Sequence, residues 1–220
     1  SIFTITYYTY EQTNKLTSII ISCVFLSTSL FVFLHILSCM GINPCFTSEA
    51  AQKSAIYWKL SRLIMPIGLF TVNIIEPNKR GNRPQLFFLL TTFFVIGLIV
   101  LLIEKQSFFF HILCHSITGA NRGRIFEIMS MVRFVGAIIF YSKNANKIKG
   151  DKSSYFFMAG LISSTIGEGA FIFYTDIYDK YYVVGQLFRI ISYYLYFRAL
   201  FVINVQKPYR ELHQAETEIS

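Results

Sequence analysis

The sequence predicts an all-α fold, a polytopic bundle of transmembrane helices. Of the 220 residues, 54% are hydrophobic and only 15% are charged, whereas about 25% of the residues of an ordinary soluble domain are charged. The apolar residues are gathered into long runs, and a helix needs about 20 mainly apolar residues to cross the hydrocarbon core of a bilayer. The chain therefore has too little polar surface to cover a water-facing globule of its size.

Six runs are long and apolar enough to be full membrane-spanning helices. The second run is the most polar, and the third consists mainly of Phe, Leu, Val and Ile. Residues 1–10 are also apolar and lack the basic start and cleavage site of a signal peptide, so we expect the end of a truncated first helix there. The expected spans are residues 16–38, 50–75, 85–103, 125–142, 154–174 and 183–205.

The polar segment after the last span is expected to be a helix of another kind. Pro208 suits the first turn of a helix. Leu212, Ala215 and Ile219 recur at spacings of three and four, so they share one helical face. We therefore divide the chain into a transmembrane domain, residues 1–206, and the start of a connecting helix, residues 207–220, with a frayed polar tail as the alternative.

The formal charge of +8 is carried mostly between the spans. Loops rich in Lys and Arg alternate with poorer ones, and because positively charged loops stay in the cytoplasm, the C-terminus is predicted to be cytoplasmic. Nucleic-acid binding is not expected, since no basic helix stands apart from the spans. The richer loops contain Lys15, Lys79, Arg80, Arg83, Lys143, Lys147, Lys149, Lys152, Lys207 and Arg210, and the poorer loops contain Lys53, Lys105, Arg122, Arg124 and Lys180.

Charged side chains inside the spans are expected to face the bundle, because a charge at the centre of a bilayer costs about 2.5 kcal/mol or more. Glu168 lies in the fifth span, and its candidate partners are Arg62, Arg133 and Arg189. Trp58 lies four residues before Arg62 and shares its helical face, so the guanidinium is placed to stack on the indole or on an apolar neighbour.

The fifth span also carries small residues at a spacing of four, which let neighbouring helices approach closely. Glu168 continues one of these rows, so it is expected to turn toward the bundle and not toward lipid. Two interpretations stay open: a structural ion pair that fixes helix order, or a polar pocket that meets a ligand. The rows are Ala159, Ser163 and Gly167, and beside them Gly160 and Ser164.

Other reactive residues indicate no catalytic centre or cofactor. His111, Cys114 and His115 have a spacing that suits a metal but lack an obvious fourth ligand. Cys39 and Cys45 flank a turn and would form a disulfide only if that turn faced an oxidising compartment. The sequence contains no Gly-rich phosphate loop, no H-E-x-x-H and no G-x-S-x-G. The chain is therefore expected not to be an enzyme.

Several short runs, in order along the chain, carry a resemblance to a known family. They are residues 35–41 (HILSCMG), Tyr57, Trp58 and Arg62, then Glu168, Phe171, Tyr174, Gly185, Arg189, Ile190, Ser192 and Tyr194, and finally residues 196–201 (YFRALF) and 207–209 (KPY). In this order the chain resembles the MASE3 membrane-associated sensor domain over nearly its whole length. It departs from the family at Val32, where an acidic residue is usual, and at Gln186, where His is frequent.

The resemblance implies a sensory input domain in the bacterial inner membrane. Such domains precede a histidine kinase or diguanylate cyclase in the same parent chain, so it also implies a cytoplasmic effector after Ser220, a homodimer and an unknown small ligand. The residues expected to bind the ligand or to switch are His35, Trp58, Arg62, Glu168, Tyr174 and Arg189, and those expected to transmit the signal are Arg198, Pro208 and Tyr209.

Two other functions compete with a sensor. A small transporter or channel subunit would use the same buried charges as a pathway, although the sequence has no internal repeat and Pro66 is the only proline deep in a span. A membrane enzyme with a haem or metal is the third interpretation. Transport in liposomes would distinguish a transporter from a sensor. Bound metal or colour in the purified protein would distinguish a haem or metal enzyme from a sensor.

Overall fold

The computed structural model describes residues 2–13, 15–40, 48–75, 80, 84–105, 120–144, 152–173 and 179–219. All regular elements of this part of the chain are helices, and the β-structure found in it is a single antiparallel bridge between Lys15 and Arg80. The all-α prediction is therefore confirmed. The elements are α1 (Ile2–Thr13), α2 (Leu16–Met40), α3 (Ser48–Ile74), α4 (Gln85–Glu104), α6 (Ala120–Asn144), α7 (Lys152–Phe173), α8 (Lys180–Phe201), the π-helix η2 (Val202–Gln206) and α9 (Lys207–Ile219).

Each predicted span coincides with a helix to within a few residues. Within the described ranges, five stretches are long and apolar enough to cross a membrane, and α3 is not among them. The count of six spans is thus not confirmed by length and hydropathy. The five stretches are Leu16–Ser38, Gln85–Glu104, Ile125–Lys143, Ser153–Phe173 and Lys180–Arg210.

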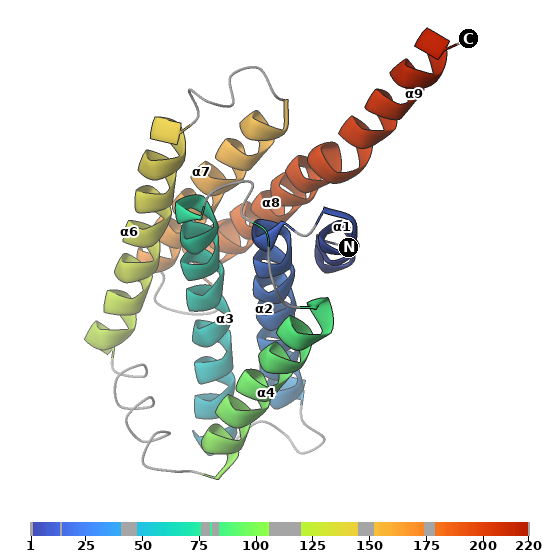
Figure 1. Cartoon of the computed structure of the whole chain (residues 1–220). Helices are drawn as coiled ribbons and strands as arrows, with labels where there is room; N and C mark the ends of the chain where they lie inside the picture. The colour runs from blue at the N-terminus through green and yellow to red at the C-terminus, as the bar shows by residue number, and fades with distance from the viewer. Residues whose placement is uncertain are drawn as a thin grey trace.

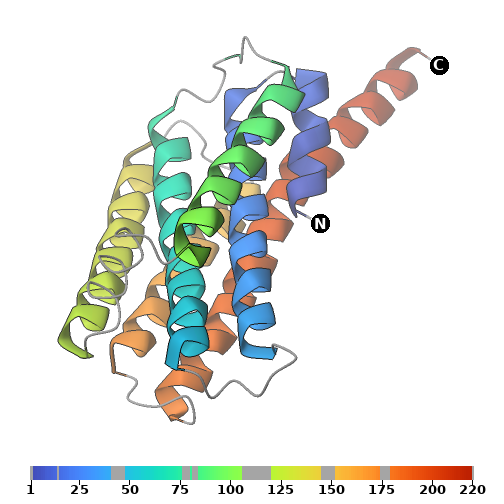
Figure 2. The same cartoon turned by 90° about the horizontal axis from the view of Figure 1, so that it is seen from below.

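The helices run back and forth along one bundle (Figures 1 and 2). α3 packs against α2 on one side and α6 on the other, α7 packs between α6 and α8, and α4 lies at the periphery against α2. α9 continues from α8 and projects away from the bundle (Figure 1). Because the chain reverses at each connection, the second half of α7 and the first halves of α3, α6 and α8 lie at the end opposite α9.

Among the residues that the structure describes, the buried apolar side chains form two clusters. The larger core joins α2, α3, α6, α7 and α8, and the smaller one joins α2, α3 and α4. The larger core is built on Ile21, Phe25, Met65, Leu69, Phe134, Ala137, Phe157, Leu161, Tyr196, Ala199 and Leu200, and the smaller on Phe31, Ile56, Tyr57, Ile96 and Ile103.

Glycines of α7 and α8 leave room for aromatic rings of the facing helix, which agrees with the close packing predicted for this face of the fifth span. A Cβ on Gly160 would lie 2.7 Å from the ring of Tyr196, and a Cβ on Gly185 would lie 2.7 Å from the ring of Phe171. The hydroxyls of Ser164 and Tyr196 also lie 3.0 Å apart across the same interface. The interface thereby places Glu168 on the inner side of α7, where it is 6% exposed.

Candidate functional site

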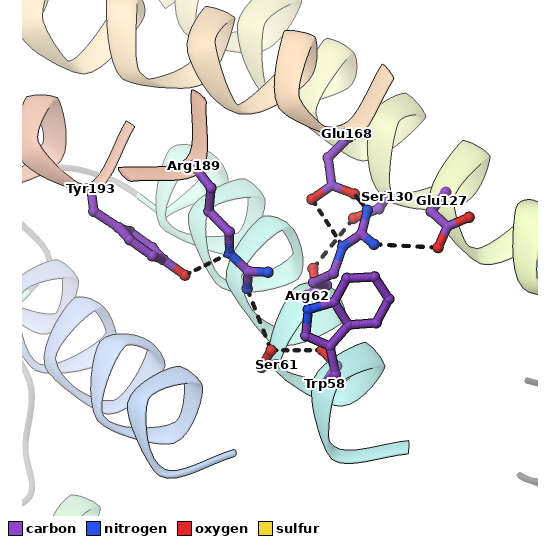
Figure 3. Close-up of polar contacts among 8 residues, drawn as sticks. All are labelled: Trp58, Ser61, Arg62, Glu127, Ser130, Glu168, Arg189 and Tyr193. Atoms are coloured by element: carbon purple, nitrogen blue, oxygen red, sulfur yellow. Dashed lines mark hydrogen bonds and ion pairs between the residues drawn. The ribbon is translucent and has the colours of Figure 1, made fainter. Parts of the chain in front are cut away.

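Arg62 is the centre of a buried ion-pair cluster that joins three helices (Figure 3). From α3, its Nη1 lies 3.3 Å from Oε1 of Glu127 on α6, and its Nε donates to Oε1 of Glu168 on α7 at 3.4 Å. Its Nη2 makes a second hydrogen bond to Glu168. Arg62 and Glu127 are each 4% exposed. One guanidinium therefore holds two buried carboxylates, an arrangement whose cost is offset only while all three groups stay paired.

Aromatic rings enclose the same guanidinium. Its central carbon lies 4.6 Å from the ring centroid of Trp58 and 4.1 Å from that of Phe171. Trp58 and Phe171 meet edge to face at 5.7 Å, and Tyr182 contacts both rings. The stacking of Arg62 on Trp58 agrees with the sequence prediction. Cation–π contacts are strongest away from water, so these rings stabilise the charge as well as the position of Arg62.

Arg189 connects α8 to this cluster through hydroxyl groups. Its Nε donates to the hydroxyl of Tyr193 at 3.1 Å, and its Nη2 donates to Oγ of Ser61 on α3 at 3.4 Å (Figure 3). Ser61 in turn donates to the backbone carbonyl of Trp58 at 2.7 Å. Arg189 also interacts electrostatically with Glu168. A displacement of α8 therefore acts on the helical turn that carries Trp58 and Arg62.

His35 joins α2 to α3 beside Trp58. Its Nδ1 lies 2.8 Å from Oγ and 2.9 Å from the backbone carbonyl of Ser54 on α3. Its ring lies 6.4 Å from the ring of Trp58, centroid to centroid. His35 therefore belongs to the same layer of side chains as the cluster. Within the described residues it has no hydrogen bond to Glu127 or Glu168.

Two small cavities flank Arg62. One lies between α3, α7 and α8 and is lined by polar groups that include Glu168 and Arg189, and the other lies between α3 and α6 beside Lys59 and Glu127. Each has a volume of about 10 Å³, which is room for roughly one water molecule. A larger ligand therefore enters only if side chains or helices move.

Most of the predicted site residues come together. His35, Trp58, Arg62, Glu168 and Arg189 form one layer across α2, α3, α7 and α8, and of the three candidate partners of Glu168 the one within ion-pair distance is Arg62. Arg133 does not pair with Glu168, and its buried Nη1 has no hydrogen-bond partner in the described part of the molecule.

The predicted transmission residues lie elsewhere. Arg198 is further along α8, with its guanidinium carbon 5.4 Å from the ring centroid of Phe156. Pro208 and Tyr209 are at the start of α9, where Tyr209 is 73% exposed. Tyr174, His111, Cys114, His115 and Cys45, together with the side chain of Cys39, lie outside the described residues.

The sequence analysis did not include Glu127 or Ser61 among the site residues. The signal for Glu127 was present, because it is an acidic residue in a span of otherwise low charge, the same argument that selected Glu168. For Ser61 no sequence signal existed, since a serine in a helix usually bonds to its own backbone, as this one also does. Its role as acceptor for Arg189 depends on how α3 and α8 are placed.

Comparison with known proteins agrees with the resemblance of the short runs. No curated protein and no solved structure gives a significant match. A family model, MASE3, described as a membrane-associated sensor domain, matches residues 1–208. That match takes in every helix of the bundle, the ion-pair cluster and the π-helix. The chain therefore belongs to the MASE3 family of membrane-associated sensor domains.

Proposed function

We propose that this chain is the sensory input domain of a bacterial signal-transduction protein, and that the ion-pair cluster around Arg62 is its switch. The observation that carries the proposal is one buried guanidinium on α3 that holds a carboxylate from α6 and another from α7. A contact of this kind has few intermediate arrangements, because a buried charge that loses its partner is very costly. The cluster is thus suited to two states and not to a continuum.

In this proposal α3 also crosses the bilayer, which brings the number of spans to six. Its 27 residues exceed the length that a span needs. Its low hydropathy comes largely from charged residues, among them Lys59 and Arg62, which are 8% and 4% exposed. Glu127 interacts electrostatically with Lys59 and pairs with Arg62. Charges that face the bundle and have partners are compatible with a membrane segment.

A stimulus acts on the end of the bundle opposite α9. A ligand shifts such an equilibrium only by binding one state better than the other. The water-sized cavity beside Glu168 and Arg189 leaves no room for an organic ligand in the present arrangement, so the ligand would favour a more open one. Opening would separate α7 or α8 from α3, and the bonds of Arg189 to Ser61 and Tyr193 would change with it.

The output leaves through the last helices. α8 carries Arg189 within the bundle, and the chain continues through η2 into α9 without a break in helical structure. The loops rich in Lys and Arg favour a cytoplasmic C-terminus. We therefore propose that α9 connects to a histidine kinase or diguanylate cyclase in a homodimeric parent protein, and that Arg198, Pro208 and Tyr209 lie on the path of the signal.

The test is the activity of the parent protein's effector in membrane vesicles. Glu168→Gln removes one charge from the cluster and keeps the shape of the side chain, so basal phosphorylation or cyclic dinucleotide synthesis should change several-fold. Glu104→Gln is the matched control, because Glu104 pairs with Lys53 at the edge of the bundle and its side chain is 50% exposed. Equal outputs of the Glu168→Gln, Glu104→Gln and unaltered proteins would contradict the proposal.

A liposome assay addresses the transporter alternative. The purified chain should give no ion or solute flux above that of empty liposomes. Flux that Glu168→Gln abolished would replace the sensor proposal by the transporter.

A further inference from the structure

The helix that leaves the bundle changes its type for five residues. Val202–Gln206 form a π-helix between α8 and α9. Here the N–H of Lys207 bonds to the carbonyl of Val202, five residues earlier, whereas an α-helix would use the carbonyl four residues earlier. A π-helical turn therefore holds one residue more than the α-helical turn that it replaces.

Pro208 gives a local reason for this wider turn. In an α-helix the carbonyl of Asn204 would face the ring of Pro208 and would have no N–H to accept from it. A wider turn moves that carbonyl away from the ring. The other common way to fit a proline is an α-helix that kinks at this position. The same sequence thus has two helical solutions, which differ by one residue in the turn.

The π-helix lies where the bundle ends. Val202 is 4% exposed, and the buried residues Ala199 and Leu200 lie three and two residues before it. Ile203 and Val205, in contrast, are 42% and 40% exposed. η2 contacts α7 and α1 as well as its neighbours in the chain. A change in how α7 and α8 pack therefore reaches η2 before it reaches α9.

We infer that η2 sets the rotational phase of α9, and that exchange of its π-helical turn for a kinked α-helical turn is the output step of the bundle. Each residue of an α-helix adds about 100° of rotation and 1.5 Å of rise. Absorbing the extra residue into an α-helix would turn α9 by about 100° relative to α8. The output step rests on the proposed function, whereas the phase of α9 is a property of this chain alone.

The experiment measures that phase by distances between spin labels on the full 220-residue chain in lipid nanodiscs. The four native cysteines are replaced by serine. One label is placed at Tyr155, 72% exposed on α7, and the other at His213, whose side chain is 74% exposed on α9. A second pair uses Gln214, also exposed, which lies about 100° further round α9.

Pro208→Ala should convert η2 to an α-helix and move the labels on α9 by a distance on the order of 10 Å, close to the diameter of a helix. Deletion of Asn204 in the Pro208→Ala background is the matched control. It removes the extra residue, so it should restore the distances of the unaltered chain while keeping the helix α-helical. Unchanged distances in Pro208→Ala would overturn the inference, and so would distances that the deletion fails to restore.

Glu168→Gln separates the two proposals. If η2 is the output step, Glu168→Gln shifts the distance distribution of the unaltered chain toward that of Pro208→Ala and has no further effect in the Pro208→Ala background. If Pro208→Ala changes the distances between the labels and Glu168→Gln does not, the result would support η2 as the element that sets the phase of α9. It would also overturn the ion-pair cluster as the switch that drives it.

Discussion

Helices α3 and α4 place their polar and apolar residues in opposite ways. α4 is the most apolar of the described helices, yet only 11% of its apolar stretch is buried inside the protein. α3 is more polar and is not among the five apolar stretches, yet its Arg62 is 4% exposed and its Ile56 is fully buried. In a soluble protein these exposures would be reversed. The difference shows that the apolar helix leaves most of its surface exposed, as a lipid-facing helix does, while the polar groups gather inside the bundle.

The largest effect should follow from removing the centre of the buried cluster. Arg62→Met leaves Glu127 and Glu168 buried without their cation, which should lower the stability of the folded bundle by about 3–5 kcal/mol. Unfolding by a denaturing detergent in mixed micelles measures this. A loss below about 1 kcal/mol would show that the two carboxylates are hydrated or protonated. The buried charges of α3 would then contribute little to the stability of the bundle.

A charge on the lipid-facing side of α4 should be the next most harmful change. Phe94 is 72% exposed, so the side chain of Phe94→Arg has no place in the bundle and should make membrane insertion of this span less favourable by about 3 kcal/mol. Glycosylation mapping of the flanking loops reports the inserted fraction. Phe94→Leu is the control and should insert like the unaltered span. Normal insertion of Phe94→Arg would mean that α4 has a covered face.

A glycine packed inside the bundle, on α8, and a glycine on the exposed surface of α4 should differ in their tolerance of a methyl group. Gly185→Ala places a Cβ 2.7 Å from the ring of Phe171, so overpacking should cost about 1–3 kcal/mol. Gly97→Ala on α4 meets nothing within 4 Å and should be neutral or slightly stabilising. The same detergent titration compares both variants. Equal losses of stability would show that Gly97 also sits in a packed interface.

The smallest effect should come from the ion pair that links α3 to α4. Lys53 and Glu104 lie 2.9 Å apart, and the carboxylate also accepts from the hydroxyl of Tyr57 at 3.0 Å. Because the side chain of Glu104 is 50% exposed, Glu104→Gln should cost less than about 1 kcal/mol. A loss as large as that of Arg62→Met would indicate that α4 is held by polar contacts and not by its apolar surface.

Much of the candidate site could be predicted because charges inside apolar runs are rare. Glu168 and Arg62 were selected on that ground, and the geometry pairs them. The identity of the partner could not be predicted, since Arg62, Arg133 and Arg189 all fit the sequence equally well. Which guanidinium reaches Glu168 depends on the order and rotation of four helices, and neither quantity is encoded in local spacing.

Tyr196 illustrates the same limit in the core. Tyrosines near the end of a membrane span are commonly anchors at the membrane surface. Tyr194 is indeed 60% exposed, but Tyr196 is fully buried, packs on Gly160 and pairs its hydroxyl with Ser164. Two positions along a helix amount to about 200° of rotation, so neighbouring residues of one type have opposite environments once the bundle fixes that rotation.

By itself, the sequence determined the helical class, the approximate positions of the long helices and the need for internal partners for charged residues. Each of these follows from local composition, because a bilayer demands long apolar helices and penalises isolated charge. Tertiary structure alone decided that Arg62 bridges Glu127 and Glu168 and that Ser61 receives Arg189. These contacts join residues from different helices, and their geometry exists only after the helices have packed.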